Sequence, residues 1–166
     1  YAGVFVGSHP HAVAIGDVTG DDHADVVLLT TFRFDPANDY SIFVFPQEAS
    51  GTLGTPRKYR YVVPTSLAGL VVTDLDENGV QDVVVGHNAG ITVFLAEGQG
   101  GLLPGAAFSD GDATILQAAD VDHDGHVDIV SLGQSRGANV FIGNGHGGFP
   151  RRIPVATYAD AFDDLE

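Results

Sequence analysis

The sequence predicts an all-β fold made of three similar units, and three observations carry this prediction. An oxygen-rich motif occurs three times, with oxygen-bearing side chains at its positions 1, 3, 5 and 9: Asp17–Asp25, Asp74–Asp82 and Asp120–Asp128. The segments that flank each motif are short and rich in β-branched residues, which is typical of strands. With 22 glycines and eight prolines in 166 residues, the chain has many turns and little room for long helices.

The chemistry of the motif indicates a calcium site. Ca²⁺ takes six to eight oxygen ligands, and alternate residues of a tight loop supply them. Glycine at position 6 lets the backbone turn over the ion. Position 7 varies in type, which is consistent with a ligand that is a backbone carbonyl. The candidate ligands are Asp17, Thr19, Asp21, His23 and Asp25 in the first loop, Asp74, Asp76, Asn78, Val80 and Asp82 in the second, and Asp120, Asp122, Asp124, His126 and Asp128 in the third.

The flanking residues decide which kind of calcium loop this is. An EF-hand closes its site with Glu at position 12 and lies between two helices. Here position 12 is Leu28, Val85 or Ser131, and the neighbouring segments are strand-like. We therefore expect calcium loops within β-hairpins, with the ninth-position Asp as the first residue of the second strand.

The three loops differ in expected affinity. The third has four Asp side chains and should bind Ca²⁺ best, and the second follows because it has Asn78 at position 5. The first has the neutral Thr19 at position 3 and Asp22 where glycine is preferred. Asp tolerates a left-handed conformation better than most residues, so the first loop can keep its shape. The alternative for each loop is an acidic turn that binds no metal.

Each loop is followed by further strand signals. A third strand is expected at Val44-Phe45, Val93-Phe94 and Val140-Phe141, and a fourth at Leu53, Leu102 and Phe149 after a glycine-bearing turn. Four short antiparallel strands in about 45–55 residues match one blade of a β-propeller. We divide the chain into an outer strand of a preceding blade (1–8), three blades (9–62, 63–110 and 111–157) and the start of a further blade (158–166), with Asp164 and Glu166 in a fourth loop. We therefore expect an internal slice of a longer array, with further blades of the same chain as neighbours.

Several stretches resemble the FG-GAP/VCBS repeat family, the calcium-loop repeats of integrin α-subunit propellers and of many secreted bacterial proteins. They are "AIGDVTGDDHADVVLL", "VVTDLDENGVQDVVVG" with "VFLAEGQGGL", and "AADVDHDGHVDIVSLG" with "VFIGNGHGGF". The resemblance implies a β-propeller, usually of seven blades, with Ca²⁺ in the loop between the first two strands of each blade. WD40 blades have a similar period but depend on a Trp-Asp signature, and this chain has no Trp.

A long link in the first unit, Thr30–Tyr40, contains a second candidate site. Phe32, Arg33, Phe34 and Tyr40 place aromatic rings beside polar groups, which suits contact with a sugar or a peptide. We expect this link at the end of the sheet opposite the calcium loops. The alternative is an extended hairpin that packs on its own neighbours.

Composition limits the remaining functions. The net charge of −15 repels phosphate backbones, which argues against nucleic acid as a partner. There is no cysteine for a disulfide or thiolate zinc site, and no apolar run reaches the ~18 residues of a membrane span. No catalytic constellation is visible.

The leading hypothesis is a non-catalytic, secreted or cell-surface module that binds Ca²⁺ and serves cell adhesion or the recognition of a carbohydrate or an extracellular protein. The alternative is the propeller domain of a secreted polysaccharide lyase or hydrolase. A purely structural role is a third hypothesis for the function of the chain.

Overall fold

The computed structural model describes residues 8–31, 34–35, 37–61, 69–98, 101–109, 112–134 and 137–156. These residues form twelve strands, which confirms the all-β class. None of them belongs to a helix long and apolar enough to cross a membrane. Except for Ser8, the expected outer strand at 1–8 lies outside the described residues, and so do Asp164 and Glu166.

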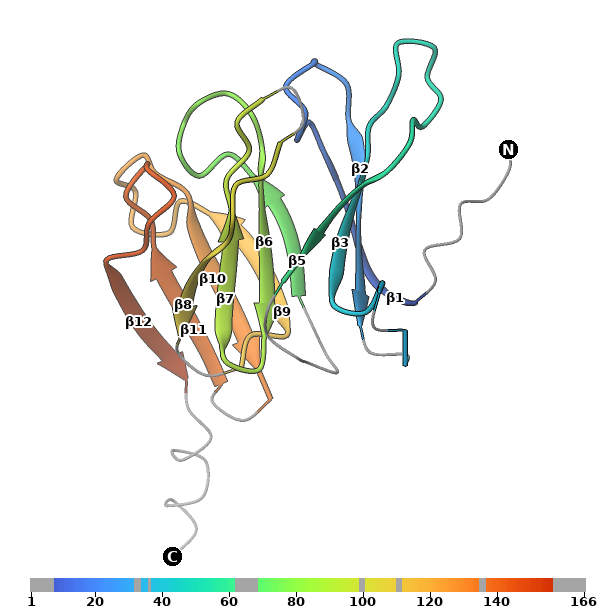
Figure 1. Ribbon diagram of the computed structural model, residues 1–166. Helices are drawn as coiled ribbons and strands as arrows, with labels where there is room; N and C mark the ends of the chain where they lie inside the picture. Colours follow the sequence, from blue (N-terminus) through green and yellow to red (C-terminus); the bar gives the residue numbers. More distant parts are fainter. Residues whose placement is uncertain are drawn as a thin grey trace, which may run out of the picture.

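The strands form three four-stranded antiparallel sheets, and neighbouring strands in each sheet are consecutive in the chain (Figure 1). The first sheet contains β1 (His9–Gly16), β2 (Asp25–Thr31), β3 (Ser41–Phe45) and β4 (Arg57–Arg60). The second contains β5 (Gly69–Thr73), β6 (Asp82–His87), β7 (Gly90–Phe94) and β8 (Ala106–Ser109). The third contains β9 (Ile115–Ala119), β10 (Asp128–Gly133), β11 (Gly137–Ile142) and β12 (Arg151–Ala156).

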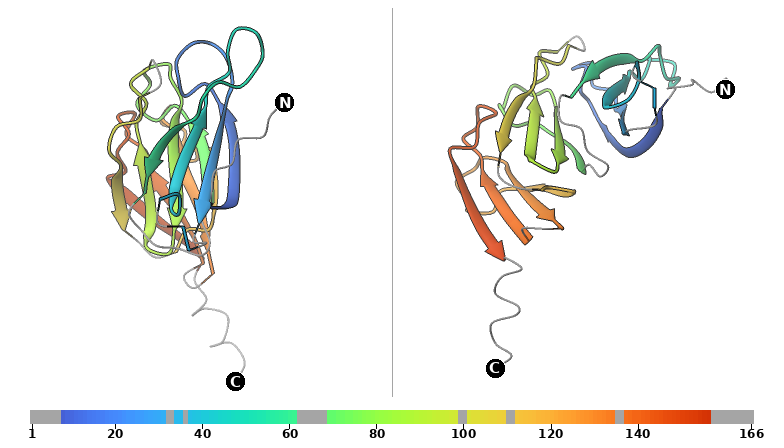
Figure 2. Two further views of the ribbon diagram at one scale, coloured as in Figure 1. Left: turned by 45° about the vertical axis from the view of Figure 1, so that its right-hand side comes forward. Right: turned by 60° about the horizontal axis from the view of Figure 1, so that its bottom comes forward.

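The three sheets follow one another along an arc, like successive blades of a propeller (Figure 2). The first strands meet, because β5 contacts both β1 and β9. The fourth strands lie on the outside of the arc (Figure 2). The ends of the strands therefore form two faces of the array. The connection between the first and second strands lies on the same face in all three sheets, and the same holds for the other connections within a sheet.

The second sheet is buried on both sides, which explains its run of valines. Successive side chains of a strand point to opposite faces. Val83 and Val85 pack into the core between the first and second sheets, together with Val27 and Leu29 of β2. Val84 points the other way, into a core that the second sheet shares with the third. A strand covered on both faces needs apolar residues at every position, as in Val83–Val85.

The core between the second and third sheets contains side chains from both sheets. Ile129 and Phe141 pack there against Ile91 and Val93 of β7. Ile129 is completely buried, and so is Ile91. Burial of one such side chain contributes about 1.5–3 kcal/mol, so the contacts between sheets stabilise the array strongly.

The positions of the fourth strands differ from those expected. Leu53 and Leu102 are not in strands; each forms an isolated antiparallel bridge, with Gln47 and Ala96 respectively. The fourth strands begin later, at Arg57, Ala106 and Arg151. The apolar signal at Leu53 and Leu102 therefore marks the closing pair of a longer turn, and the outer strands begin three or more residues later.

His87, at the end of β6, is a buried polar residue with a clear proton assignment. The backbone N–H of Ala89 donates to its Nδ1 at 3.2 Å, so Nε2 carries the proton and donates to the Thr92 hydroxyl at 2.9 Å. The side chain is only 1% exposed, and burial lowers the pKa of His87 below its ordinary value of 6.5.

This environment predicts a pH-dependent loss of stability. The unfolded chain binds a proton at His87 more readily than the folded chain, so the stabilisation present above pH 6.5 is lost as the pH falls below that value. Between pH 7 and 5, the unfolding free energy of the wild type should fall more steeply than that of His87→Gln, by up to about 1.4 kcal/mol per pH unit. Urea denaturation at several pH values measures both slopes. Equal slopes would show that His87 is not the responsible group.

Candidate calcium-binding loops

The three acidic loops connect β1 to β2, β5 to β6 and β9 to β10. They therefore lie at the same end of the three sheets (Figure 1). The turns between the third and fourth strands, such as 46–56 in the first sheet, lie at this end as well. The long link between β2 and β3 is at the opposite end, where the sequence predicts it.

A buried carboxylate closes each loop. Asp25, Asp82 and Asp128 are the first residues of β2, β6 and β10, as expected from the sequence, and all are 0% exposed. One oxygen of Asp82 accepts the N–H of Leu75 in the loop, and the other accepts the N–H of Ala96 just after β7, both at 2.8 Å. The carboxylate thus links the loop to the end of the third strand.

The same arrangement occurs in the other two sheets. Asp128 accepts the N–H of Val121 at 2.9 Å and that of Gly143 at 2.8 Å. Asp25 accepts three N–H groups: those of Val18 and Thr19 at 3.0 Å and that of Gln47 at 2.9 Å. Buried N–H groups cost about 1–3 kcal/mol each when they lack an acceptor, so the ninth-position Asp is required by the fold itself.

The loop backbone is left-handed at two positions in every copy. Both position 4 and position 6 have a positive φ between 62° and 94°. The residues are Gly20 and Asp22 in the first loop, Glu77 and Gly79 in the second, and His123 and Gly125 in the third. The prediction that Asp22 adopts this conformation is confirmed, with φ at 65°. Each loop has a single glycine at these two positions. The glycine is at position 6 in the second and third loops and at position 4 in the first loop.

The first-position Asp also holds the loop backbone. In the second loop, Oδ2 of Asp74 accepts the N–H of Gly79 at 2.9 Å, while its Oδ1 is buried without a hydrogen-bond partner. In the first loop, by contrast, both oxygens of Asp17 are used: Oδ1 accepts the N–H of Gly20 at 2.6 Å and Oδ2 that of Asp22 at 2.8 Å. The second loop therefore keeps an available oxygen that the first loop lacks.

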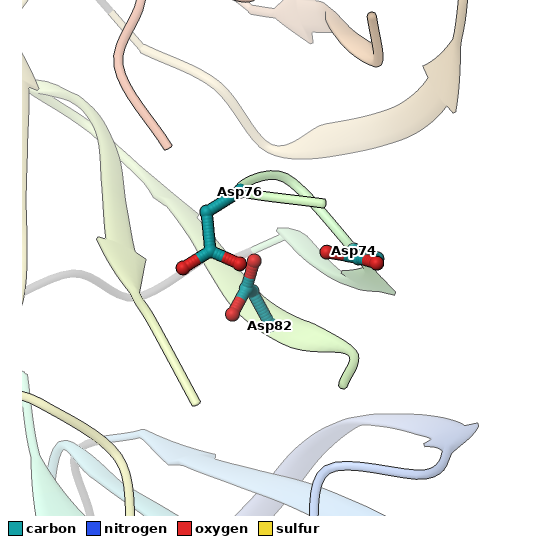
Figure 3. A group of neighbouring side chains, drawn as sticks. All are labelled: Asp74, Asp76 and Asp82. Atoms are coloured by element: carbon teal, nitrogen blue, oxygen red, sulfur yellow. The ribbon is translucent and has the colours of Figure 1, made fainter. Parts of the chain in front are cut away.

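Two of the loops bring three carboxylates together. Asp74, Asp76 and Asp82 each place an oxygen within 4.8 Å of the others. In Figure 3, the carboxylates of Asp76 and Asp82 point toward each other, with Asp74 at the start of the same loop. The third loop gathers Asp120, Asp122 and Asp124 in the same way. Within the described residues, the acids of the first loop do not form such a group.

The second loop is electrostatically unfavourable without a cation. The pKa of Asp82 is raised to about 6, mainly by burial and to a smaller extent by the neighbouring Asp76 and Asp74. The N–H groups of Ala96 and Leu75 act in the opposite direction, but burial is the larger effect. A divalent cation among these oxygens would favour the ionised carboxylate and provide a partner for Oδ1 of Asp74. The donor set therefore fits a hard cation such as Ca²⁺.

The residue at position 7 varies in type but makes defined contacts: its backbone N–H binds a side chain of its own loop, and in the third loop its side chain contacts the second loop. Nδ1 of His126 lies 2.5 Å from Oε1 of Glu77, and this contact joins the third loop to the second. The hydrogen bond with Glu77 raises the pKa of His126. The N–H of His126 donates to Oδ1 of Asp124 at 2.9 Å, and those of Val80 and His23 bind the fifth-position side chains of their own loops in the same way.

Gln81, at position 8 of the second loop, is a contact residue that the sequence pattern did not indicate. Its N–H donates to the Asp17 carbonyl at 2.8 Å, and its Oε1 accepts the Asp17 N–H at 2.9 Å. The N–H of Gly147 likewise donates to the carbonyl of Leu75 at 3.0 Å. Neighbouring sheets are thus joined by hydrogen bonds at the loops themselves.

The second candidate site, in the link of the first unit, is only partly described. Phe34 is 85% exposed and has a positive φ of 63°. Tyr40 packs instead at the edge of the core between the first two sheets, where its ring meets that of Tyr61 edge-on at 6.0 Å. Phe32 and Arg33 lie outside the described residues.

The structure also contains a cleft that the sequence did not predict. It has a volume of about 230 Å³ and lies between the first loop and the turn after β3. Thr19 and Asp21 line one side, and Gln47, Glu48 and Arg57 line the other. Its polar lining comes from segments far apart in the sequence, so no local motif could have revealed it.

Comparison with known families identifies the central part of the chain. Residues 74–131 match the family model described as FG-GAP-like repeat. The chain contains an FG-GAP-like repeat. The matched segment starts at the first residue of the second loop and includes the whole third loop, which confirms the resemblance drawn from these residues.

The arrangement of the sheets is also found in a solved structure. A lectin from Agrocybe aegerita, described as specifically recognising non-reducing terminal N-acetylglucosamine, matches with a TM-score of 0.66 and 23% sequence identity. The match covers 90% of this chain and 39% of the lectin, so the chain spans well under half the lectin's length. At this identity the likeness concerns the fold. None of the curated proteins matches the chain.

The buried ninth-position Asp leads to a prediction about stability without metal. In EDTA, Asp25→Ala should lower the unfolding free energy by about 2–4 kcal/mol, because it leaves two buried N–H groups and one partly buried N–H group without an acceptor. Asp25→Asn keeps one acceptor oxygen, so it should lower the unfolding free energy by less than Asp25→Ala does. Asp21→Ala, in the same loop but exposed, should change it by less than about 1 kcal/mol. Urea denaturation measures all three, and similar losses for Asp25→Ala and Asp21→Ala would contradict the structural role.

Proposed function

We propose that the chain is a calcium-stabilised β-propeller segment of a secreted or cell-surface protein, and that it serves adhesion or the recognition of a carbohydrate or an extracellular protein. The observation that carries the proposal is the gathering of Asp74, Asp76 and Asp82, together with the buried Oδ1 of Asp74 that lacks a hydrogen-bond partner. Repulsion among three acids is costly unless a cation neutralises it.

The proposed ligands differ between loops. Asp74, Asp76, Asn78 and Asp82 would hold Ca²⁺ in the second loop, and Asp120, Asp122, Asp124 and Asp128 in the third, with carbonyls of Val80 and His126 as further ligands. Asp17, Thr19, Asp21, His23 and Asp25 form the weakest site, because Asp17 already gives both of its oxygens to loop N–H groups. A calcium loop of modest affinity suits an extracellular setting, where sites bind at about 10⁻⁴–10⁻³ M.

Calcium in these loops would stiffen the junctions between sheets. Gln81 and Leu75 belong to the second loop and bond directly to the first loop and to the third sheet. An ion that orders the second loop therefore also orders these contacts. The result would be a rigid array that presents its hairpins and outer strands to a ligand.

The recognition role draws support from two sources. The FG-GAP-like match covers the two loops with gathered carboxylates, and the structurally similar lectin is described as recognising a sugar. We propose binding without turnover, and the propeller domain of a polysaccharide-degrading enzyme is the alternative.

The central experiment is thermal unfolding of the chain with Ca²⁺, Mg²⁺ or EDTA. Calcium binds the folded loops and not the open chain, so millimolar Ca²⁺ should raise Tm, by several degrees at about 100 times Kd. Mg²⁺ should substitute poorly, because it demands a tighter octahedral shell. Asp124→Ala should lose more of the calcium-dependent increase than Asp21→Ala, since the first loop gathers no three carboxylates.

Two results would contradict the proposal. A melting curve that is the same in Ca²⁺ and EDTA would remove the calcium site, and a larger effect of Asp21→Ala would reverse the ranking of the loops. On the same calcium-loaded protein, saturable glycan or protein binding supports recognition, whereas cleavage of a polysaccharide would assign the chain to an enzyme.

A further inference from the structure

The basic residues of this acidic chain are concentrated on its outer strands. Every Lys and Arg among the described residues lies on β4 or β12: Arg57, Lys58, Arg60, Arg151 and Arg152. Arg57 and Arg151 begin these strands at the end of the sheets where the acidic loops lie, and each is close to an acidic residue of a loop. In a chain of net charge −15, such positions are where an anionic ligand can approach.

A groove of about 380 Å³ runs beside two of these arginines, between the outer strands of the second and third sheets. Phe108 and Ser109 of β8 line one side, and Arg151 and Arg152 of β12 line the other. This volume is at the lower end of the range for small-molecule sites, so it suits one or two sugar rings.

The groove has a rigid aromatic floor. The ring of Phe149 meets Phe108 at 5.2 Å and Phe141 at 6.1 Å, both edge-on. Phe141 is only 4% exposed and anchors the group in the core, whereas Phe108 and Phe149 are partly exposed. Exposed aromatic surface of this kind suits contact with the apolar C–H face of a sugar ring.

Arg151 connects this groove to the third acidic loop. Its Nη2 donates to Oδ2 of Asp122 at 3.2 Å, and Asp122 is the third-position residue of that loop. Arg151 remains 60% exposed, so the pair is weak. Its neighbour Arg152 donates to Oδ1 of Asn139 at 2.7 Å, which holds the second guanidinium at the groove.

We propose that this groove binds a carboxylate-bearing sugar, whose ring packs on Phe108 and Phe149 while its carboxylate pairs with Arg151. Ca²⁺ in the third loop strengthens this binding, because it engages Asp122 and releases Arg151. This inference rests on the proposed calcium occupancy of that loop. The guanidinium is a planar, always charged donor, well matched to a carboxylate.

A sugar fits this place better than an acidic peptide. An extended peptide would add to the open edge of β12, but Pro154 lies in the middle of that strand and offers no N–H for pairing. The arginines on β12 also protect the edge against strand addition. A small anionic ligand needs only the groove.

NMR titration of the ¹⁵N-labelled chain can test the groove and the loops separately. A shift of the Gly125 amide signal reports Ca²⁺ binding in the third loop, and a shift of the Gly79 amide reports it in the second. Shifts of the Ser109 and Phe149 amides report ligand binding in the groove. With saturating Ca²⁺, D-glucuronate should shift Ser109 and Phe149 saturably, and D-glucose should bind at least about tenfold more weakly because it lacks the carboxylate. In EDTA, glucuronate should bind about two- to fivefold more weakly.

The variant Arg151→Gln should change the two affinities in opposite directions. Glucuronate binding should weaken at least about tenfold. Calcium binding at Gly125 should tighten about two- to fivefold, because no guanidinium competes for Asp122. Misfolding would weaken both. Arg60→Gln removes the same charge from β4 and is the matched control, which should leave both affinities unchanged.

The outcomes separate this inference from the proposed function. If Ca²⁺ shifts Gly79 and Gly125 but glucuronate leaves Ser109 and Phe149 unchanged, the groove assignment is wrong while the calcium role stands. Glucuronate shifts confined to Gly125, or tighter binding of penta-glutamate than of glucuronate at Ser109, would also overturn it. If Ca²⁺ shifts neither glycine, the proposed function fails and the coupling fails with it.

Discussion

The rest of the structure depends on a buried carboxylate at the start of the second strand of each sheet. Asp25, Asp82 and Asp128 accept N–H groups from both the preceding loop and the segment after the third strand. In the second sheet the charge is costly, because burial raises the pKa of Asp82. The hydrogen bonds offset part of that cost and hold the loop closed even without an ion. A cation in the loop would offset more, so the same carboxylate serves both the fold and the proposed metal site.

The loops and the sheets support one another. The middle sheet has apolar residues on both faces because it is covered by a neighbour on each side, and its loop bonds to both neighbours through Gln81 and Leu75. The loops are therefore part of the contact between sheets. Ordering one loop favours the order of the next, which is how a small ion could stabilise an array whose units are stable mainly through their neighbours.

Much of this architecture could be predicted from the sequence, because the loop motif is local. Its spacing placed the ninth Asp at the start of a strand and Asp22 in a left-handed conformation, and both are observed. The sequence did not reveal that Glu77 and His123 are left-handed as well, since neither residue type indicates it. It misplaced the fourth strands, because Leu53 and Leu102 are apolar residues that close turns ahead of those strands. The groove at Phe108 and Arg151 could not be predicted, because it joins two units and depends on their packing.

The central claim is that the buried carboxylates hold the loops in place before any metal binds. Hydrogen exchange measured in EDTA tests it most directly. The amides of Leu75, Ala96, Val121 and Gly143 donate to Asp82 or Asp128, and they should exchange at least about 100-fold more slowly than the exposed loop amides of Gly79 and Gly125. Exchange of all six amides at similar rates in EDTA, with protection only in Ca²⁺, would contradict the claim and make the metal the element that forms the loops.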